Sequence, residues 1–161
     1  MGPTIRFGQV GVGYFPLALK LENLEDVEIP GLTRLSCEEL TVSMPVWALL
    51  TYKKPVDVVA VSPRLKMDEG LLDRLQSTSQ PSEKKPVYLR RLNVVKGNLG
   101  WRDKSSKTEV SADSIEIESV TQQGGGFLKI TVPHALLMLP LSGDRIRLLG
   151  QLKLEIKLLS D

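Results

Sequence analysis

The stretch IRLLGQLKLEIKLL, from Ile146 to Leu159, alternates apolar and polar side chains with a period of two. Its even positions hold six aliphatic residues and Gly150, and its odd positions are mainly charged or amide residues. This period is typical of a β-strand with one apolar and one wetted face. The strand would be about 43 Å long, more than twice the usual length. Such a face must lie against another part of the sheet, a helix or an apolar ligand.

The composition limits the classes of protein to which this chain can belong. Its 161 residues are enough for one domain, and 42% of them are hydrophobic, which permits a packed core. The formal charge of +2 is close to balance, and the basic residues are scattered along the chain. Nucleic-acid binding favours a clustered basic stripe with aromatic platforms, so we expect no nucleic-acid partner.

Residues with catalytic or metal-binding chemistry are few. Cys37 and His134 are the single cysteine and histidine, and no further ligands stand at the spacing of a metal site. Glu116 and Glu118 share a face of an alternating run, as solvated strand carboxylates commonly do. Glycines 8, 11 and 13 lack the spacing of a dinucleotide-binding loop. We therefore expect no enzyme, no metal and no cofactor, and we expect Cys37 to be a small buried residue.

The first half of the chain is predicted to form strands around one short helix. Apolar residues alternate at positions 10, 12 and 14, at 17, 19 and 21 after Pro16, and at 40, 42 and 44. In the stretch from Pro45 to Pro55, the apolar positions 46, 49 and 50 predict a helix of about two turns. Pro63 interrupts the next strand. The stretch that starts at Leu71 begins as a second short helix, and the polar residues 76–86 predict a flexible loop.

The second half, residues 87–161, is predicted to form strands joined by short turns, with breaks at Gly97 and Gly100. Short turns between successive strands favour antiparallel neighbours. We therefore predict a mostly β fold: an antiparallel meander sheet curled into a groove or half-barrel, with one or two short helices in the N-terminal half. One domain, 1–161, would comprise strands and a plug helix (1–75), the loop (76–86) and the meander (87–161). The sequence leaves the strand register around Pro16, Gly97 and Pro133 open.

Two stretches together resemble the AsmA family of envelope proteins. The first has a Phe15–Pro16 pair in a strand, a strand from Leu40 to Met44, a short helix from Pro45 to Tyr52, and a strand from Val56 to Met67 that contains Pro63. The second is similar to the repeat of AsmA-like proteins, in which a strand with a Gly, an aromatic residue and an Asp turns into an alternating strand. Its matching residues are Val94, Gly97, Leu99, Trp101, Asp103, Ile115 and Ile117.

The resemblance implies a fold and a function. AsmA-like proteins extend into the periplasm as a long antiparallel sheet rolled into an apolar groove, an architecture shared with chorein-type lipid bridges. The family is implicated in moving phospholipid from the inner to the outer membrane and in envelope biogenesis. The implied location is the periplasm, with an inner-membrane anchor that would precede residue 1, since this chain has no run of about 20 apolar residues. The implied partner is phospholipid or another acyl lipid.

The candidate lipid-contacting residues are the inward-facing aliphatic residues of the last three strands. They are Ile115, Ile117, Leu128, Ile130, Val132, Ile146, Leu148, Leu152, Leu154, Ile156 and Leu158. The candidate plug helix contributes Val46, Trp47, Leu49 and Leu50.

Two other interpretations stay open. The apolar face is also the pattern of a closed β-sandwich or half-barrel core. The chain could also be a non-catalytic scaffold or assembly module, such as an accessory of a secretion system or of outer-membrane assembly, that pairs its edge strand with a partner. The last strand is the candidate edge, for a strand-paired neighbour or a homodimer, and Lys153 and Lys157 would only partly protect it.

Overall fold

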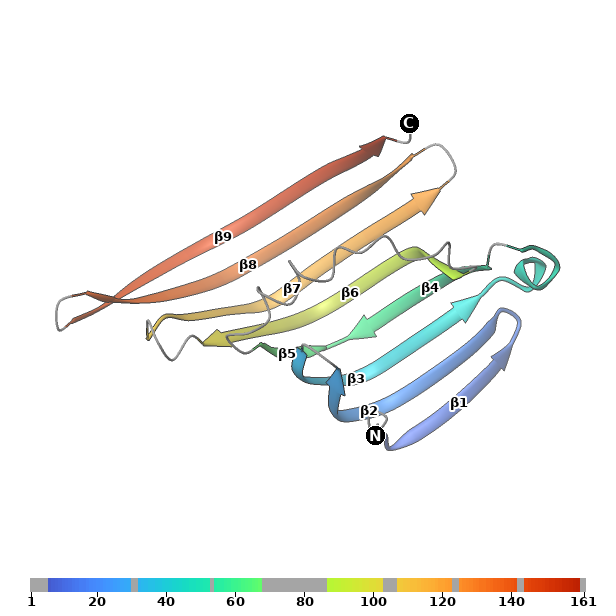
Figure 1. Ribbon diagram of the computed structural model, residues 1–161, viewed down its shortest axis with the longest axis horizontal. Coiled ribbons are helices and arrows are strands. Elements are labelled where there is room, and N and C mark those ends of the chain that lie inside the picture. The colour runs from blue at the N-terminus through green and yellow to red at the C-terminus, as the bar shows by residue number, and fades with distance from the viewer. Residues whose placement is uncertain are drawn as a thin grey trace.

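The computed structural model describes residues 6–29, 32–52, 54–67, 87–102, 107–122, 125–141 and 144–159. These residues form one nine-stranded sheet (Figure 1). Its strands are β1 (Gln9–Tyr14), β2 (Leu17–Ile29), β3 (Leu32–Met44), β4 (Lys54–Val61), β5 (Arg64–Met67), β6 (Val87–Arg102), β7 (Glu109–Gln122), β8 (Gly125–Leu141) and β9 (Asp144–Leu159). The prediction of a mostly β fold is confirmed.

The sheet is open, with β1 at one edge and β9 at the other. The hydrogen-bonded order is β1-β2-β3-β4-β6-β7-β8-β9, and the short β5 pairs with β3 and β6 beyond the end of β4. Figure 1 shows β1 and β9 at opposite edges of the sheet. The described strands therefore do not close into a barrel.

Short connections produce antiparallel neighbours, as predicted. The hairpins β1–β2, β2–β3, β6–β7, β7–β8 and β8–β9 are all antiparallel. The alternating sets of the first half also fall where the pattern places them, since Val12 lies opposite Leu19 and Leu19 lies opposite Val42. Residues directly opposite one another point to the same face of a sheet, so these sets build one continuous surface.

The prediction of an entirely antiparallel meander is wrong at the centre of the sheet. Strand β6 runs parallel to both β4 and β5, with Val58 opposite Leu92 and Leu65 opposite Leu99. Parallel neighbours need a connection of a dozen residues or more, and residues 68–86 between β5 and β6 supply that length. The predicted second helix that starts at Leu71 and the predicted loop at 76–86 lie outside the described residues.

The predicted two-turn helix after Pro45 is also not seen, since the described residues contain no α-helix. The segment forms a 3₁₀ helix, η1 (Val46–Leu50), at the end of β3 and β4. Its bonds span three residues: Ala48 N–H donates to the Pro45 carbonyl over 2.9 Å, and Thr51 N–H donates to the Ala48 carbonyl over 3.2 Å. The chain must reverse between Met44 and Lys54, and isolated α-helices this short are marginal, so a tighter turn forms instead.

A line of backbone irregularities, here called the crease, crosses the strands. It is formed by Asn23, Ser62, Lys96 and Ser114, which all have positive φ angles, and by the Pro133–His134 step in β8. Ser62 N–H donates to the Val95 carbonyl over 2.8 Å, and Asp113 lies opposite His134. The irregularities therefore lie side by side rather than scattered through the sheet.

Across the crease, the apolar residues of a strand change from even-numbered to odd-numbered positions, or the reverse, but stay on the same face of the sheet. In β8, Ile130 and Val132 are even-numbered and Leu137 is odd-numbered, yet their partners in β9 are all even: Leu154, Leu152 and Leu148. The register shift between Val132 and Ala135 inserts the extra residue that makes this possible. Strand β9 has no such insertion and places Gly150 at the crease, which explains its long unbroken alternation.

A cluster of buried residues lies in the first half of this face. Leu24, Val27, Cys37 and Ala60 form a cluster, and the partly buried Leu21, Leu35, Leu40 and Val94 pack against it. Among the described residues no polar or charged residue is buried. Cys37 is 5% exposed, and its thiol donates to the carbonyls of Glu39 and Val61, as a small structural residue does.

Candidate functional site

A continuous apolar row crosses the sheet from edge to edge. It consists of residues that lie directly opposite one another on neighbouring strands: Val10, Leu21, Leu40, Ala60, Val94, Ile117, Ile130 and Leu154. Because each pair points to the same side of the sheet, all eight residues lie on one face. We call this set the Val10–Leu154 row, and the face that carries it the apolar face.

An adjacent residue of each strand points to the opposite face and forms a second, mainly polar row, here called the polar row. That row consists of Gly11, Lys20, Thr41, Val59, Asn93, Glu118, Lys129 and Glu155. Lys20 forms ion pairs there with Glu22 over 2.8 Å and with Glu39 over 3.0 Å. Its hydrogen bonds to these carboxylates raise the pKa of Lys20 above its usual value. The two faces therefore differ sharply in polarity.

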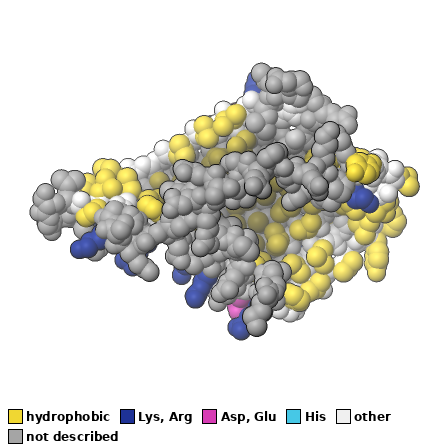
Figure 2. Space-filling view, viewed as in Figure 1, with side chains coloured by type: hydrophobic (Ala, Val, Ile, Leu, Met, Phe, Trp, Pro, Cys, Tyr) yellow, Lys and Arg dark blue, Asp and Glu magenta, His cyan; other side chains and the backbone are white. Residues whose placement is uncertain are grey.

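The apolar face is open towards both edges of the sheet. Val10 and Val12 of β1 are 47% and 62% exposed, and Leu152 and Leu154 of β9 are 52% and 38% exposed. The middle of the row is more enclosed, since Ala60 is only 8% exposed. Figure 2 shows hydrophobic side chains on the face presented in Figure 1, over the strands near the β1 edge and over those near the β9 edge. Large aliphatic groups left in water forgo about 1.5–3 kcal/mol each, so such a face favours an apolar partner.

The structure brings most of the predicted lipid-contacting residues onto this face. Leu128, Ile130 and Val132 of β8 lie opposite Ile156, Leu154 and Leu152 of β9, and Ile146 and Leu148 continue the β9 set beyond the crease. Ile117 lies opposite Ile130, and Ile115 lies opposite Gly97. Leu158 lies opposite Gly126 in the backbone register, and its side chain is outside the described part.

The predicted plug residues stand at the end of the strands, in η1. Val46, Trp47 and Leu49 are about half exposed and Leu50 is 91% exposed, whereas Ala48 between them is fully buried. Figure 1 shows η1 beyond the ends of β3 and β4. The anchor of this turn is therefore Ala48, and the larger side chains around it project into solvent.

Sequence reasoning missed the contribution of the first half to the row. Val10, Leu21, Leu40 and Ala60 supply four of its eight members, and Val94 of β6 joins them to β7. The alternating sets at positions 10–14, 17–21 and 40–44 carried the signal. These patterns do not indicate which strands pair, and it is the pairing through β4 and β6 that places them in line with β7, β8 and β9.

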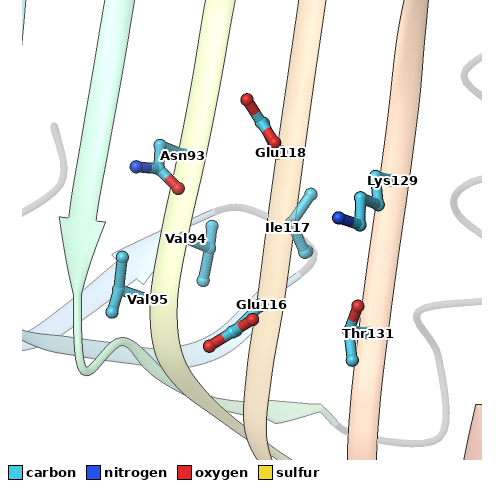
Figure 3. A pocket seen from close by; sticks show the side chains of 8 residues that line it. All are labelled: Asn93, Val94, Val95, Glu116, Ile117, Glu118, Lys129 and Thr131. Carbon is cyan, nitrogen blue, oxygen red and sulfur yellow. The ribbon is translucent and has the colours of Figure 1, made fainter. Parts of the chain in front are cut away.

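The opposite face carries a shallow pocket over β6, β7 and β8, of about 240 Å³ (Figure 3). Its polar lining includes Asn93, Glu116, Glu118, Lys129 and Thr131. Figure 3 shows Lys129 extending from β8 towards β7, and Glu116 and Glu118 standing along β7 as their shared strand face predicts. In the ranges that the structure describes, no group of three or more His, Cys, Asp or Glu residues could hold a metal ion.

No helix within the described ranges is both long and apolar enough to cross a membrane. The chain matches no model of a known protein family. No curated protein is significantly similar to it.

Proposed function

We propose that this protein binds the acyl chains of phospholipid on its apolar face, as a non-catalytic module of lipid transport between membranes. The observation that carries the proposal is the Val10–Leu154 row, an unbroken line of aliphatic residues across eight strands. The row ends in exposed side chains at both edges, where an elongated apolar ligand would find contact.

The dimensions of the row suit such a ligand. Strands are spaced ~4.8 Å apart, so a row across eight strands is about 34 Å long. The hydrocarbon core of a bilayer is about 30 Å thick, and one leaflet accounts for half of that. A lipid lying along the row would therefore find apolar contact over the full length of an acyl chain, across the strands rather than along β9.

The distribution of charge supports the same use. An unpaired charge in contact with hydrocarbon is costly, so a surface for acyl chains must keep its charges elsewhere. Here Lys20, Glu118, Lys129 and Glu155 stand in the polar row on the opposite face. The headgroup would stay at the water-facing side of the ligand. Binding of this kind needs no catalytic residue.

The resemblance to AsmA-like proteins supports a cellular role for this activity. We propose that the protein acts in the periplasm, held at the inner membrane, and that it contributes phospholipid to outer-membrane biogenesis. Curling of the sheet around the bound lipid would complete the apolar groove that this architecture uses.

Native mass spectrometry of the purified protein, with lipid extraction from the same sample, tests the proposal. We expect a stoichiometric complex with phospholipid. A protein that carries none, and that gains none when offered phospholipid vesicles, would show that the apolar face is not a lipid site.

Variants on the β1 side make the test specific to the apolar face. Val12→Glu and Leu19→Glu place a charge on two residues that lie opposite each other and are 62% and 43% exposed. We expect both variants to keep their circular dichroism spectra and lose bound lipid, since a carboxylate would face the acyl chain. Leu149→Glu is the matched control, because Leu149 is 85% exposed on the opposite face. Equal loss in all three variants would contradict a face-specific site.

A further inference from the structure

Strand β9 presents an open edge along its whole length. One side of β9 pairs with β8, from Gly125 opposite Leu159 to Leu141 opposite Asp144, and no described strand pairs with its other side. All side chains of residues 146–157 are exposed. Unpaired backbone groups on a long regular strand form a template for another strand.

The charges of β9 select one register for pairing with itself. Antiparallel registers centred on a residue keep the apolar faces of the two copies on the same side of the sheet. The register centred on Leu154 aligns residues 149–159 of the two copies and places Lys153 opposite Glu155 of the second copy, twice by symmetry. It also places Leu152 opposite Ile156 on the apolar face. Opposite charges at such positions are favourable cross-strand pairs.

The other long registers set like charges against each other. Centring on Leu152 places Arg147 opposite Lys157, and centring on Lys153 places that lysine opposite itself. Centring on Gln151 places Lys157 opposite Arg145, a position within the strand. Like charges directly opposite are destabilising. The Leu154-centred register is therefore the longest one free of like-charge pairs.

We propose that two copies of this chain form a symmetric dimer through antiparallel β9–β9 pairing centred on Leu154. The two-fold axis lies perpendicular to the sheet, so the nine strands of each copy join into one larger sheet. The Val10–Leu154 row of one copy then continues into that of the other at the Leu154 pair. The inference rests on the edge and its charges and does not depend on the proposed lipid function.

The β1 edge does not offer a comparable partner. Its sequence, QVGVGY, is six residues long and carries no charge, so it has no group complementary to Lys153 or Glu155. A β1–β9 contact would also be head-to-tail and would lead to open-ended assembly rather than a closed dimer. The charge pattern therefore favours a second copy of β9.

Sedimentation equilibrium across a concentration series tests the dimer. We expect the wild-type chain to dimerise reversibly. Lys153→Glu should weaken dimerisation by at least about tenfold, because two ion pairs become two like-charge pairs. Within its own sheet Lys153 lies opposite Thr131, so this substitution creates no direct like-charge contact with β8. Lys66→Glu, an equal charge change on an exposed residue of β5, is the control and should leave dimerisation unchanged.

Reversal of both charges tests directly whether Lys153 and Glu155 of the two copies lie opposite each other. Glu155→Lys should also weaken self-association; because it sets a lysine opposite Lys129 of β8, its circular dichroism spectrum must match that of the wild type. An equimolar mixture of the Lys153→Glu and Glu155→Lys chains should form a mixed dimer. One chain then presents two carboxylates at these positions and the other presents two ammonium groups, so both cross-strand contacts are complementary. The double variant Lys153→Glu/Glu155→Lys should dimerise like the wild type. A wild-type chain that stays monomeric at high concentration would overturn the proposal, and so would a dimer indifferent to these reversals.

Discussion

Arg90 binds Asp57 across the seam where strand β6 runs parallel to β4. The Nε of Arg90 donates to Oδ1 of Asp57 over 2.8 Å, and the Nη2 of Arg90 contacts Oδ2 of the same carboxylate. Arg90 is the extra residue of a register shift, since Val56 lies opposite Leu89 and Asp57 lies opposite Arg91. The bulge thus aims a guanidinium at a carboxylate that is only 15% exposed.

Removing this pair should weaken the whole sheet. We expect Asp57→Asn to lower the free energy of unfolding at neutral pH by roughly 1.5–3 kcal/mol, the range for hydrogen bonds to charged groups. Urea denaturation followed by circular dichroism measures the change. Asp113→Asn, which neutralises an exposed carboxylate on β7, should cost far less. Equal losses would show that the pair adds nothing specific.

The same pair predicts a pH dependence of stability. The hydrogen bonds from Arg90 hold the pKa of Asp57 below its ordinary value of 3.8. A lowered carboxyl pKa contributes stability that is fully present above the ordinary value and is lost as the pH falls through the folded-state value. The stability difference between wild type and Asp57→Asn should therefore be constant near neutrality and shrink below about pH 4. A difference that grows on acidification would contradict this assignment.

Two glycines of β6 should respond oppositely to alanine. A Cβ on Gly97 would lie 3.0 Å from Val94 Cγ1 and 3.3 Å from the Ile115 carbonyl, whereas a Cβ on Gly100 would meet nothing within 4 Å. We expect Gly97→Ala to destabilise the protein by about 1–3 kcal/mol through overpacking. Gly100→Ala should be neutral or stabilising by up to about 1 kcal/mol, because it reduces the freedom of the unfolded chain. Denaturation midpoints compare the two, and the reverse order would refute the packing argument.

The crease predicts the effect of substitutions at Ser114. Its φ of +57° is a conformation that glycine adopts freely and that β-branched residues strongly disfavour. We expect Ser114→Gly to raise the melting temperature modestly and Ser114→Val to lower it by several degrees. Ser119→Val, at a regular position opposite Leu128 in the same strand, is the comparison that isolates the backbone effect. If valine were tolerated equally at both positions, the crease at Ser114 would not be a conformational requirement.

The thiol of Cys37 should be unreactive in the folded protein. It is 5% exposed, and burial raises the pKa of its thiol above the usual value of 9.0, which lowers the thiolate fraction at neutral pH. We expect a thiol reagent such as DTNB to label it only at the rate of unfolding, and fully in denaturant. Labelling of the native protein as fast as free cysteine would place the residue outside the core.

Several features followed directly from the local pattern. Residues 10–14, 17–21 and 40–44 alternate, and the structure pairs them as one face. The pattern from Ile146 to Leu159 predicts one long strand, and β9 is one. The glycine break at Gly97 and the open register at Pro133 coincide with the shifts in β6 and β8. In each case a side chain or a backbone restriction visible within a few residues decides the outcome.

Other features depended on contacts between distant residues. Asp57 and Arg90 are 33 positions apart, and nothing near either one indicates the pair. The Pro45–Pro55 segment has helical spacing, yet the chain reversal between β3 and β4 makes it a 3₁₀ turn. The parallel pairing of β4 with β6 cannot be inferred from either strand, because both have the same alternating pattern in either direction.

The alternation of side chains specified that this chain forms amphipathic strands with one apolar and one polar face, because that property arises within each strand. Which strands become neighbours, in which direction and in which register, was decided only by tertiary structure. The Val10–Leu154 row shows the difference most clearly. Each of its residues is an ordinary aliphatic position in its own segment, and the row exists only because the pairing of distant strands in one register sets all eight residues opposite one another.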